Sequence, residues 1–253
     1  MEVVLLSLII FLISTVQSIA GVGVLVLGTP IMLVLNYNII ETMFFLLPIS
    51  IFSSLSNLIL INSVFKIKNK IDLKLIKYFF IFCLPSICFG LIIIKIFYKY
   101  INFNILVSII IIFSIIVKIK FEKFTYNLNK NLKKITIFLI GLIHGLTNSG
   151  GTLLSLFIAS KKKNINLIRF EIHILYFFLA TIQFIFLYFL LKNELKFYVN
   201  INISLLIIII SCFVGNIIAN KFKDLFSNVI YLLASISSII LFIKGIQQII
   251  FIT

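Results

Sequence analysis

Long apolar runs separated by short polar connections dominate this sequence. A bilayer core needs roughly 20 helical residues to span it, so runs free of Asp, Glu, Lys and Arg mark candidate spans. Eight such runs occur: Val3–Ile40, Thr42–Phe65, Tyr78–Ile94, Tyr100–Val117, Ile135–Ser160, Ile174–Leu191, Phe197–Asn220 and Leu225–Ile243. They predict an all-α, polytopic membrane protein with about eight transmembrane helices.

The first run is too long for a single helix. Its residues, about 38 in number, would extend about 57 Å as one straight helix, nearly twice the bilayer core. Gly21-Val22-Gly23 is the natural place for a break, because glycine lets a helix end. Two interpretations fit this length: a discontinuous helix that crosses the membrane, or a re-entrant hairpin with the glycines at its tip. Pro30 and Pro85 are predicted hinges, since proline removes a backbone hydrogen bond.

The glycine segment recurs in altered form in the second half of the chain. Three stretches have counterparts there: Gln17-Ser-Ile-Ala-Gly21-Val-Gly23 in His144-Gly-Leu-Thr-Asn148-Ser-Gly150-Gly151, Asn36–Glu41 in Asn164–Arg169, and Gly90–Phe97 in Gly215–Phe222. We therefore predict two four-span membrane repeats, residues 1–120 and 134–253, each with a glycine-broken first helix, joined by a basic linker at 121–133. Four crossings each would make the repeats parallel, whereas re-entrant glycine segments would make them inverted.

Composition agrees with a membrane protein. The 253 residues are 62% hydrophobic and 11% charged, with a mean hydropathy of +1.26, outside the range of soluble domains. The net charge of +15 does not indicate nucleic-acid binding, because the basic residues fall in short connections where the positive-inside rule accounts for them. With eight crossings, the larger share of Lys and Arg lies on the side of the termini. We therefore predict a multi-pass protein of the cell membrane with both termini cytoplasmic, although Lys161–Lys163 would fit the re-entrant interpretation better.

The first run continues well past signal-peptide length, so we expect a first membrane segment there.

Few chemical groups suggest metal or acid chemistry. Cys83, Cys88 and Cys212 form no metal-binding spacing, and we predict no metal and no cofactor. The seven acids all lie at a run boundary or in a loop: Glu2, Glu41, Asp72, Glu122, Glu171, Glu194 and Asp224. A carrier that couples to protons or sodium through a buried acid is therefore not indicated.

Neutral polar residues near the two breaks are candidate ligands of a small anion. Gln17 and His144 each precede a glycine by six residues, at equivalent places in the two repeats. Backbone N–H groups at a break and the positive end of a helix dipole can replace the hydration shell of an anion. The predicted substrate-binding residues are Gln17, Gly21, Gly23, His144, Asn148, Gly150, Gly151 and Thr152. Each has a competing structural interpretation as helix-packing glue, and His173, near Arg169 and Glu171, is expected at the membrane interface.

These segments resemble the TauE/SafE family of sulfite exporter-like membrane proteins. That family carries a Gly-x-Gly-Gly-type segment followed by a proline, and a second such segment at the start of the second half. Here they are Gly21-Val-Gly23-Val24 with Pro30, and Asn148-Ser-Gly150-Gly151, with Val24, Asn148 and Phe157 departing from the pattern. The resemblance covers essentially the whole chain. It implies transport, usually outward, of small anions that often contain sulfur, such as sulfite or organosulfonates.

Outward movement of an anion agrees with membrane energetics. An interior negative by about 100 mV drives one negative charge outward by roughly 2.3 kcal/mol, so export needs no coupling ion. We predict a permease whose partners are a small anion and the lipid bilayer, and no enzyme activity. One alternative is a non-transporting scaffold or assembly factor, in which the glycines only pack helices. Another is an intramembrane enzyme using His144 and His173, which lack a nucleophile or acid at a fixed spacing. No pattern indicates an oligomeric state.

Overall fold

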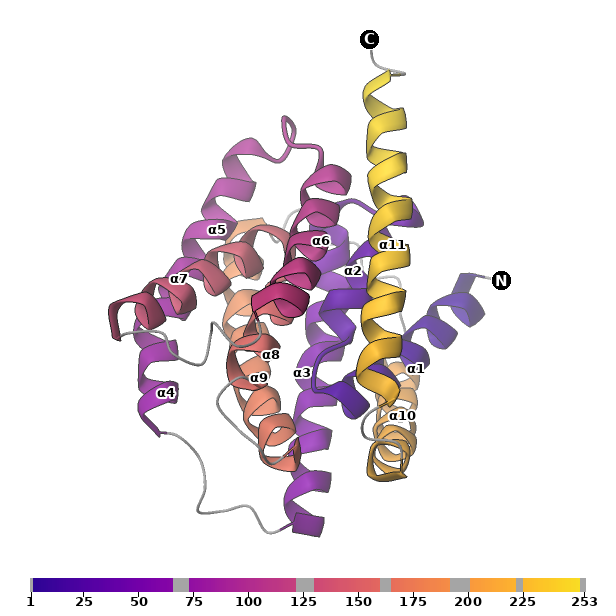
Figure 1. Cartoon of the computed structure of the whole chain (residues 1–253). Coiled ribbons are helices and arrows are strands. Elements are labelled where there is room, and N and C mark those ends of the chain that lie inside the picture. The colour runs from indigo at the N-terminus through magenta and orange to yellow at the C-terminus, as the bar shows by residue number, and fades with distance from the viewer. Residues whose placement is uncertain are drawn as a thin grey trace.

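The computed structural model describes residues 2–65, 73–121, 130–159, 165–191, 201–221 and 225–250 (Figure 1). Its helices are α1 (Glu2–Ala20), α2 (Val24–Val34), α3 (Ile39–Phe65), α4 (Leu73–Tyr78), α5 (Leu84–Phe97), α6 (Phe103–Phe121), α7 (Lys130–Thr147), α8 (Gly151–Ala159), α9 (Ile165–Leu191), α10 (Ile201–Lys221) and α11 (Leu225–Ile250). A π-helical turn, Phe79–Cys83, joins α4 to α5. The described residues contain no strand, so the all-helical prediction is confirmed.

Five segments of the described chain are long and apolar enough to cross a membrane. They are Val3–Ala20, Ile39–Val64, Leu73–Phe97, Ile165–Leu191 and Ile203–Lys221. Shorter apolar helices follow at Val24–Val34, Phe103–Val117 and Ala234–Ile250. Several predicted features lie outside the described residues: most of the linker (122–129), Lys161–Lys163, and the acids Asp72, Glu122, Glu194 and Asp224.

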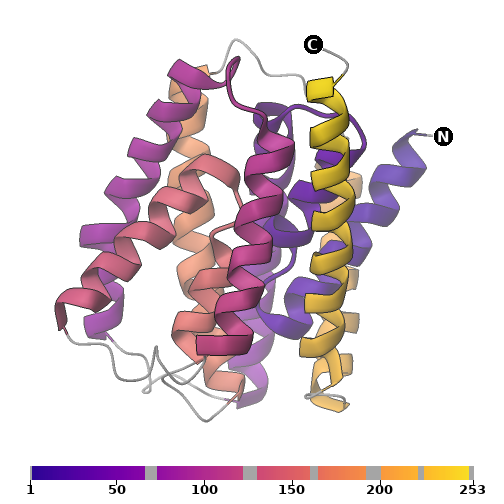
Figure 2. The same cartoon turned by 45° about the horizontal axis from the view of Figure 1, so that its top comes forward.

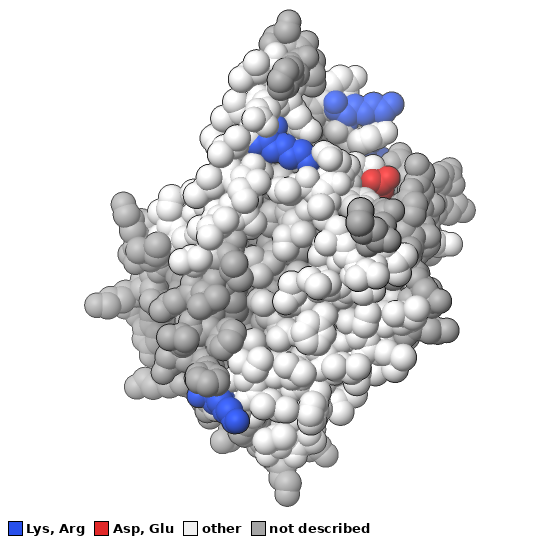
Figure 3. Space-filling view, turned by 90° about the vertical axis from the view of Figure 1, so that its right-hand side faces the viewer, with Lys and Arg blue, Asp and Glu red and all other residues white. Residues whose placement is uncertain are grey.

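The outer surface has the character of a lipid-facing one. Large apolar side chains are exposed on many helices, among them Ile59, Phe189, Leu206 and Phe213. In Figure 3 the described Lys, Arg, Asp and Glu of one face lie toward its two ends, and the described residues between them are uncharged. Charged groups are excluded from a bilayer core by the cost of removing them from water. This distribution agrees with a molecule that spans a membrane.

As predicted, the first apolar run is broken at Gly21–Gly23, and the chain then reverses direction. A Cβ added to Gly23 would lie 2.5 Å from the backbone nitrogen of Gln17 and 3.0 Å from the carbonyl oxygen of Ile13. In one straight helix, residues 13 and 23 would be about 15 Å apart along the axis. Gly23 therefore lies against the side of α1, and α1 and α2 form a helical hairpin (Figure 1).

The second glycine segment forms a hairpin of the same design. A Cβ added to Gly150 would lie 2.8 Å from the backbone nitrogen of His144 and 2.6 Å from the carbonyl oxygen of Ile140. Gly150 thus contacts the residues six and ten positions before it, as Gly23 does. Each pair of equivalent residues is separated by 127 positions in the sequence. The match in spacing is therefore also a match in geometry.

Helix packing is exchanged between the two halves of the chain (Figure 2). α3 packs along α9, and α6 packs along α11. α1 of the first half packs against α10 of the second, just as α7 of the second packs against α5 of the first. One large cluster of buried apolar side chains joins both halves. Each hairpin is consequently held by helices from the other half of the chain.

α9 begins at Ile165, nine residues before the predicted start at Ile174. Arg169 and Glu171 are both only 3% exposed, and His173, expected at the membrane interface, is fully buried. The prediction that every acid lies at a run boundary or in a loop is therefore wrong for Glu171. The predicted run began at Ile174, after these charged residues, but a helix continues through charged residues when neighbouring helices supply their contacts.

Candidate functional site

At the first break, the side chain of Gln17 closes the start of α2. Its Oε1 accepts a hydrogen bond from the backbone N–H of Val24 (3.1 Å), one of the groups that a helix start leaves without an intrahelical partner. Its Nε2 donates to the hydroxyls of Ser53 (2.7 Å) and Ser54 (3.0 Å) on α3. Both ends of this amide are therefore engaged by protein.

Gly21 and Asn148 hold equivalent turns. Gly21 has φ +80° and Asn148 has φ +62°, in the left-handed region, which among residues with a side chain Asn tolerates best. In both turns the backbone nitrogen donates to the carbonyl four residues before it, Gln17 and His144 respectively, at 2.8 Å. Asn148 also donates through Nδ2 to the hydroxyl of Thr29 on α2 (3.2 Å), which ties the second tip to the first hairpin.

His144 is at the position equivalent to Gln17, but its side chain does not cap the following helix. The side chain is fully buried, and neither ring nitrogen has a hydrogen-bond partner among the described residues. Its ring lies edge-on to that of Tyr176, with centroids 6.3 Å apart. Gln183 donates through Nε2 to the carbonyl of His144 (3.4 Å). The Oε1 of Gln183 and the Oδ1 of Asn148 also lack partners in the described part of the chain. Since buried polar groups are nearly always hydrogen-bonded, this cluster has unused capacity for a ligand.

The start of α8 is covered by Tyr176. A Cβ added to Gly151 would lie 1.2 Å from the Tyr176 hydroxyl oxygen, so this oxygen stands where a side chain would begin. Thr152 uses its own hydroxyl within the break, donating to the carbonyl of Ser149 (3.1 Å). A phenol thus lies at a helix N-terminus, the position where backbone N–H groups favour an anion.

A buried arginine lies near the first break. Arg169 of α9 donates through Nη2 to the carbonyl of Ser18, at the end of α1, and to Oδ1 of Asn216 on α10 (2.7 Å). Asn216 in turn donates to Oδ1 of Asn57 (2.6 Å), whose Nδ2 donates to the Ser18 hydroxyl (2.9 Å). This network joins α1, α3, α9 and α10. Sequence analysis did not select Arg169, because it precedes the charge-free run.

A comparison with known families decides the class of the protein. A family model described as Sulfite exporter TauE/SafE matches residues 6–245, which include both breaks and the whole of α9. The chain belongs to the TauE/SafE family. TauE/SafE proteins are membrane transporters, so this chain is a multi-pass membrane transporter of the sulfite-exporter type and not an enzyme. Searches of curated proteins and of solved structures found no significant match.

In this TauE/SafE chain, the predicted site residues fall into two groups linked by α9. Gln17, Gly21 and Gly23 form the first break, and His144, Asn148, Gly150, Gly151 and Thr152 form the second. Ile172 contacts Gly21 and Tyr176 contacts Gly151, one turn apart on α9. Neither Tyr176 nor Gln183 was predicted as a site residue. Gln183 is a neutral polar residue inside its apolar run, whereas Tyr176 gave no signal among the many aromatic residues of the same run.

The two prolines lie inside continuous helical segments of the TauE/SafE chain. Pro30 is within α2, and Pro85 is in the first turn of α5. Pro85 cannot donate to the carbonyl four residues earlier, which falls in the π-helical turn Phe79–Cys83. The π-turn therefore has a local cause, whereas the hinge role of both prolines stays a prediction.

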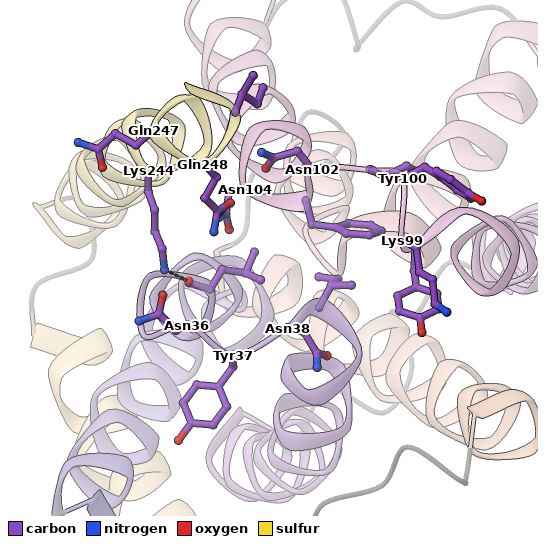
Figure 4. A pocket seen from close by; sticks show the side chains of 16 residues that line it. Asn36, Tyr37, Asn38, Lys99, Tyr100, Asn102, Asn104, Lys244, Gln247 and Gln248 are labelled. Carbon is purple, nitrogen blue, oxygen red and sulfur yellow. Dashed lines mark hydrogen bonds between the residues drawn. The ribbon is translucent and has the colours of Figure 1, made fainter. Parts of the chain in front are cut away.

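A pocket of about 960 Å³ lies at the far end of α2 from Gly23 (Figure 4). Its walls are the start of α3, the α5–α6 connection and the end of α11. Lys244 reaches from α11 to donate to the carbonyls of Leu33 (2.6 Å) and Val34 (2.9 Å) at the end of α2. No predicted site residue lines this pocket, and Gly23 lies about 15 Å along α2 from Leu33 at its edge. Within the described residues, no group of three or more His, Cys, Asp or Glu could hold a metal ion.

Proposed function

We propose that this transporter exports a small oxyanion, sulfite or a small organosulfonate, through a site at the second break. The observation that carries the proposal is the set of buried side-chain groups without partners in the described part of the chain, contributed by His144, Asn148 and Gln183. His144 supplies a ring N–H. Asn148 and Gln183 supply amide oxygens, which accept from a protonated oxyanion, or NH₂ groups after rotation of the amide. The start of α8 adds backbone donors beside them.

In this proposal the two breaks have different roles: the first is structural and the second binds the anion. Gln17 is fully engaged by Val24 and by serines of α3, so the first break is closed by protein. Gly21 and Gly23 allow the chain to reverse there, and Gly150 does so at the second break. Of the predicted substrate ligands, His144, Asn148, Gly151 and Thr152 then lie closest to the anion. None of them is acidic, which suits export driven by the membrane potential alone.

We place the glycine hairpins in the membrane as re-entrant elements. Each predicted repeat, 1–120 and 134–253, then has one hairpin and three crossings, and the repeats are inverted. Two features support this arrangement: the reversal of the chain at Gly23 and Gly150, and the exchanged packing of the two halves. The eight predicted apolar runs then correspond to six crossings and two hairpins.

Re-entrant hairpins reverse the expected orientation in the cell membrane. In a re-entrant hairpin, the start of α1 and the end of α2 lie on the same side of the membrane. The pocket brings the end of α2 together with the end of α11, so both termini lie on that side. Most of the 22 Lys and Arg then fall on the opposite side, in segments 66–77, 118–134, 161–163 and 221–223. The positive-inside rule makes that opposite side cytoplasmic. We therefore place both termini outside, whereas eight full crossings had favoured the cytoplasm.

Efflux from liposomes tests the proposed function. The full-length protein is reconstituted, and efflux of sulfite, sulfate and a small sulfonate is measured under an imposed potential. We expect saturable, potential-driven flux of sulfite or the sulfonate. No flux of any of them, from protein shown to be folded, would overturn the proposal. A stable co-purifying protein partner, with no substrate-induced stabilisation, would instead favour the scaffold alternative.

The variant His144→Gln tests the site. Glutamine at this position reproduces the first break, where Gln17 caps α2, so the hairpin should fold while its amide occupies the start of α8. We expect sulfite flux to fall at least about ten-fold, the loss expected when a hydrogen bond to a charged ligand is removed. Thr181→Ala is a matched control, because Thr181 lies on α9 and, within the described residues, bonds only the carbonyl of Phe177 in its own helix. Wild-type flux in His144→Gln would remove the second break from the transport path.

A further inference from the structure

Two basic side chains cap the two helices of the first hairpin. Arg169 donates to the carbonyl of Ser18 near the end of α1, and Lys244 donates to carbonyls of Leu33 and Val34 at the end of α2. Basic groups at the last carbonyls of a helix stabilise it. Capping alone would therefore explain both residues. Their surroundings differ, however, because Lys244 is only partly buried while Arg169 is 3% exposed.

Within the described residues, the hydrogen-bond partners of Arg169 do not neutralise its charge. Its hydrogen bonds go to a backbone carbonyl and to the amide oxygen of Asn216, both neutral. Its Nε has no hydrogen-bond partner within the described residues. Glu171 lies two positions away on the same helix, and residues two apart do not face each other. Removing a guanidinium from water is costly unless an anion or a full set of hydrogen bonds compensates.

His173 adds a second donor on the same face. It lies four residues after Arg169 on α9, so the two side chains are neighbours one turn apart. His173 is fully buried, and both of its ring nitrogens lack partners in the described part of the chain. Between them, Ile172 contacts Gly21 at the tip of the first hairpin. The two donors therefore lie in the wall beside the first break.

We propose that Arg169 and His173 form a second binding site for the transported oxyanion, reached before or after the site at His144. This proposal rests on the proposed function, since it adds a second binding site for the same ion. His173 and Tyr176 are about 4.5 Å apart along the axis of α9, so the two sites follow one another along this helix. Multiple weak sites let an ion both enter and leave a pathway.

The chemistry of Arg169 selects the class of ligand. Nη2 of Arg169 already donates to Ser18 and Asn216, whereas its Nε and the ring nitrogens of His173 have no partner within the described residues, so one N–H from each side chain can meet two oxygens of one oxyanion. A halide has a single centre and cannot use both donors in this way. The site should therefore bind sulfite or a sulfonate in preference to chloride.

The test compares the two caps. Arg169→Gln, Arg169→Lys, His173→Gln and the control Lys244→Gln are purified as full-length proteins. Sulfite and chloride serve as ligands for thermal stabilisation in detergent, and the KM for sulfite efflux is measured in liposomes. We expect Arg169→Gln and His173→Gln to raise this KM about ten-fold or more, the loss of a charge-assisted hydrogen bond. Arg169→Lys keeps the charge and the cap but should lose the preference for sulfite over chloride. Lys244→Gln should lower the melting temperature and leave the KM unchanged.

The outcomes separate this site from export itself. Sulfite efflux with a wild-type KM in folded Arg169→Gln would overturn the site and leave the proposed function standing. If Arg169→Gln does not fold, a wild-type KM and wild-type sulfite preference in both Arg169→Lys and His173→Gln would overturn it equally. Stabilisation by sulfite that depends on Arg169, without efflux by the wild type, would support the site and overturn export.

Discussion

The hydroxyl oxygen of Tyr176 lies 1.2 Å from the point where a side chain on Gly151 would begin. With Tyr176 in this position, only a glycine fits at the start of α8. The same contact places the start of α8 against α9. The polar cluster of His144, Asn148 and Gln183 lies around the same contact, so the geometry of the proposed site depends on this pair.

Gly151→Ala should destabilise the protein through Tyr176. The added methyl would overlap the hydroxyl, so Tyr176 must move and the start of α8 with it. We expect the cost of Gly151→Ala to be smaller in a Tyr176→Ala background, because coupled residues show non-additive effects of about 0.5–3 kcal/mol. A double-mutant cycle on thermal unfolding measures this coupling. Additive effects would show that the two residues do not meet.

Asn148 should tolerate glycine better than alanine in its turn. Its φ of +62° is left-handed, and there a residue such as alanine costs about 1–2 kcal/mol. Asn148→Gly loses the bond to Thr29 but keeps the turn, so it should unfold at a higher temperature than Asn148→Ala. Equal melting temperatures would contradict the strained turn.

Breaking the buried network at Arg169 should cost stability. Asn57→Ala removes its bonds to Asn216 and to the Ser18 hydroxyl, although Asn216 still donates to Cys212 and Ser18 to Ser14, so we expect a loss of about 0.5–1.5 kcal/mol for each bond removed. Ser237→Ala is the control, because the hydroxyl of Ser237 bonds only the carbonyl of Ala234, in its own helix, among the described residues. Thermal unfolding of both variants checks the expectation. A loss as small as that of the control would show that the network contributes little.

The C-terminus should lie outside the cell. Fusion of a periplasmically active phosphatase to Thr253 should give an active enzyme, whereas a fluorescent protein that folds only in the cytoplasm should stay dark. The reason is the concentration of Lys and Arg on the side opposite the termini when both glycine segments are re-entrant. The reverse pattern would restore eight full crossings.

The breaks were predictable, but their shape was not. The length of the first run required an interruption, and Gly21–Gly23 marked its place. The same glycines allow a crossing or a reversal, and the choice depends on contacts such as that of Gly23 with Ile13. The equivalence of Gln17 and His144 was visible in their spacing. Their difference was not, because Gln17 is engaged by Ser53 and Ser54, which lie more than thirty residues away in the sequence.

The start of α9 was missed for a related reason. A search for charge-free runs assumes that a helix is surrounded by lipid alone. It therefore leaves out Arg169 and Glu171, which precede the run. In the fold, Arg169 is surrounded by protein and bonds Ser18 and Asn216. A Cβ at Gly23 or Gly150 meets backbone, so valine at either position would disturb the hairpin itself and not transport alone.

α9 contacts the tips of both hairpins within one helical turn, through Ile172 at Gly21 and Tyr176 at Gly151. A helix is stiff along its axis, so these two contacts cannot shift independently. Any sliding or rotation of α9 that loosens one tip also displaces the side chain lodged against the other. In the proposed inverted arrangement, the hairpins on the two sides of the membrane are therefore mechanically linked, and a continuous open channel would require α9 to leave both hairpins at once.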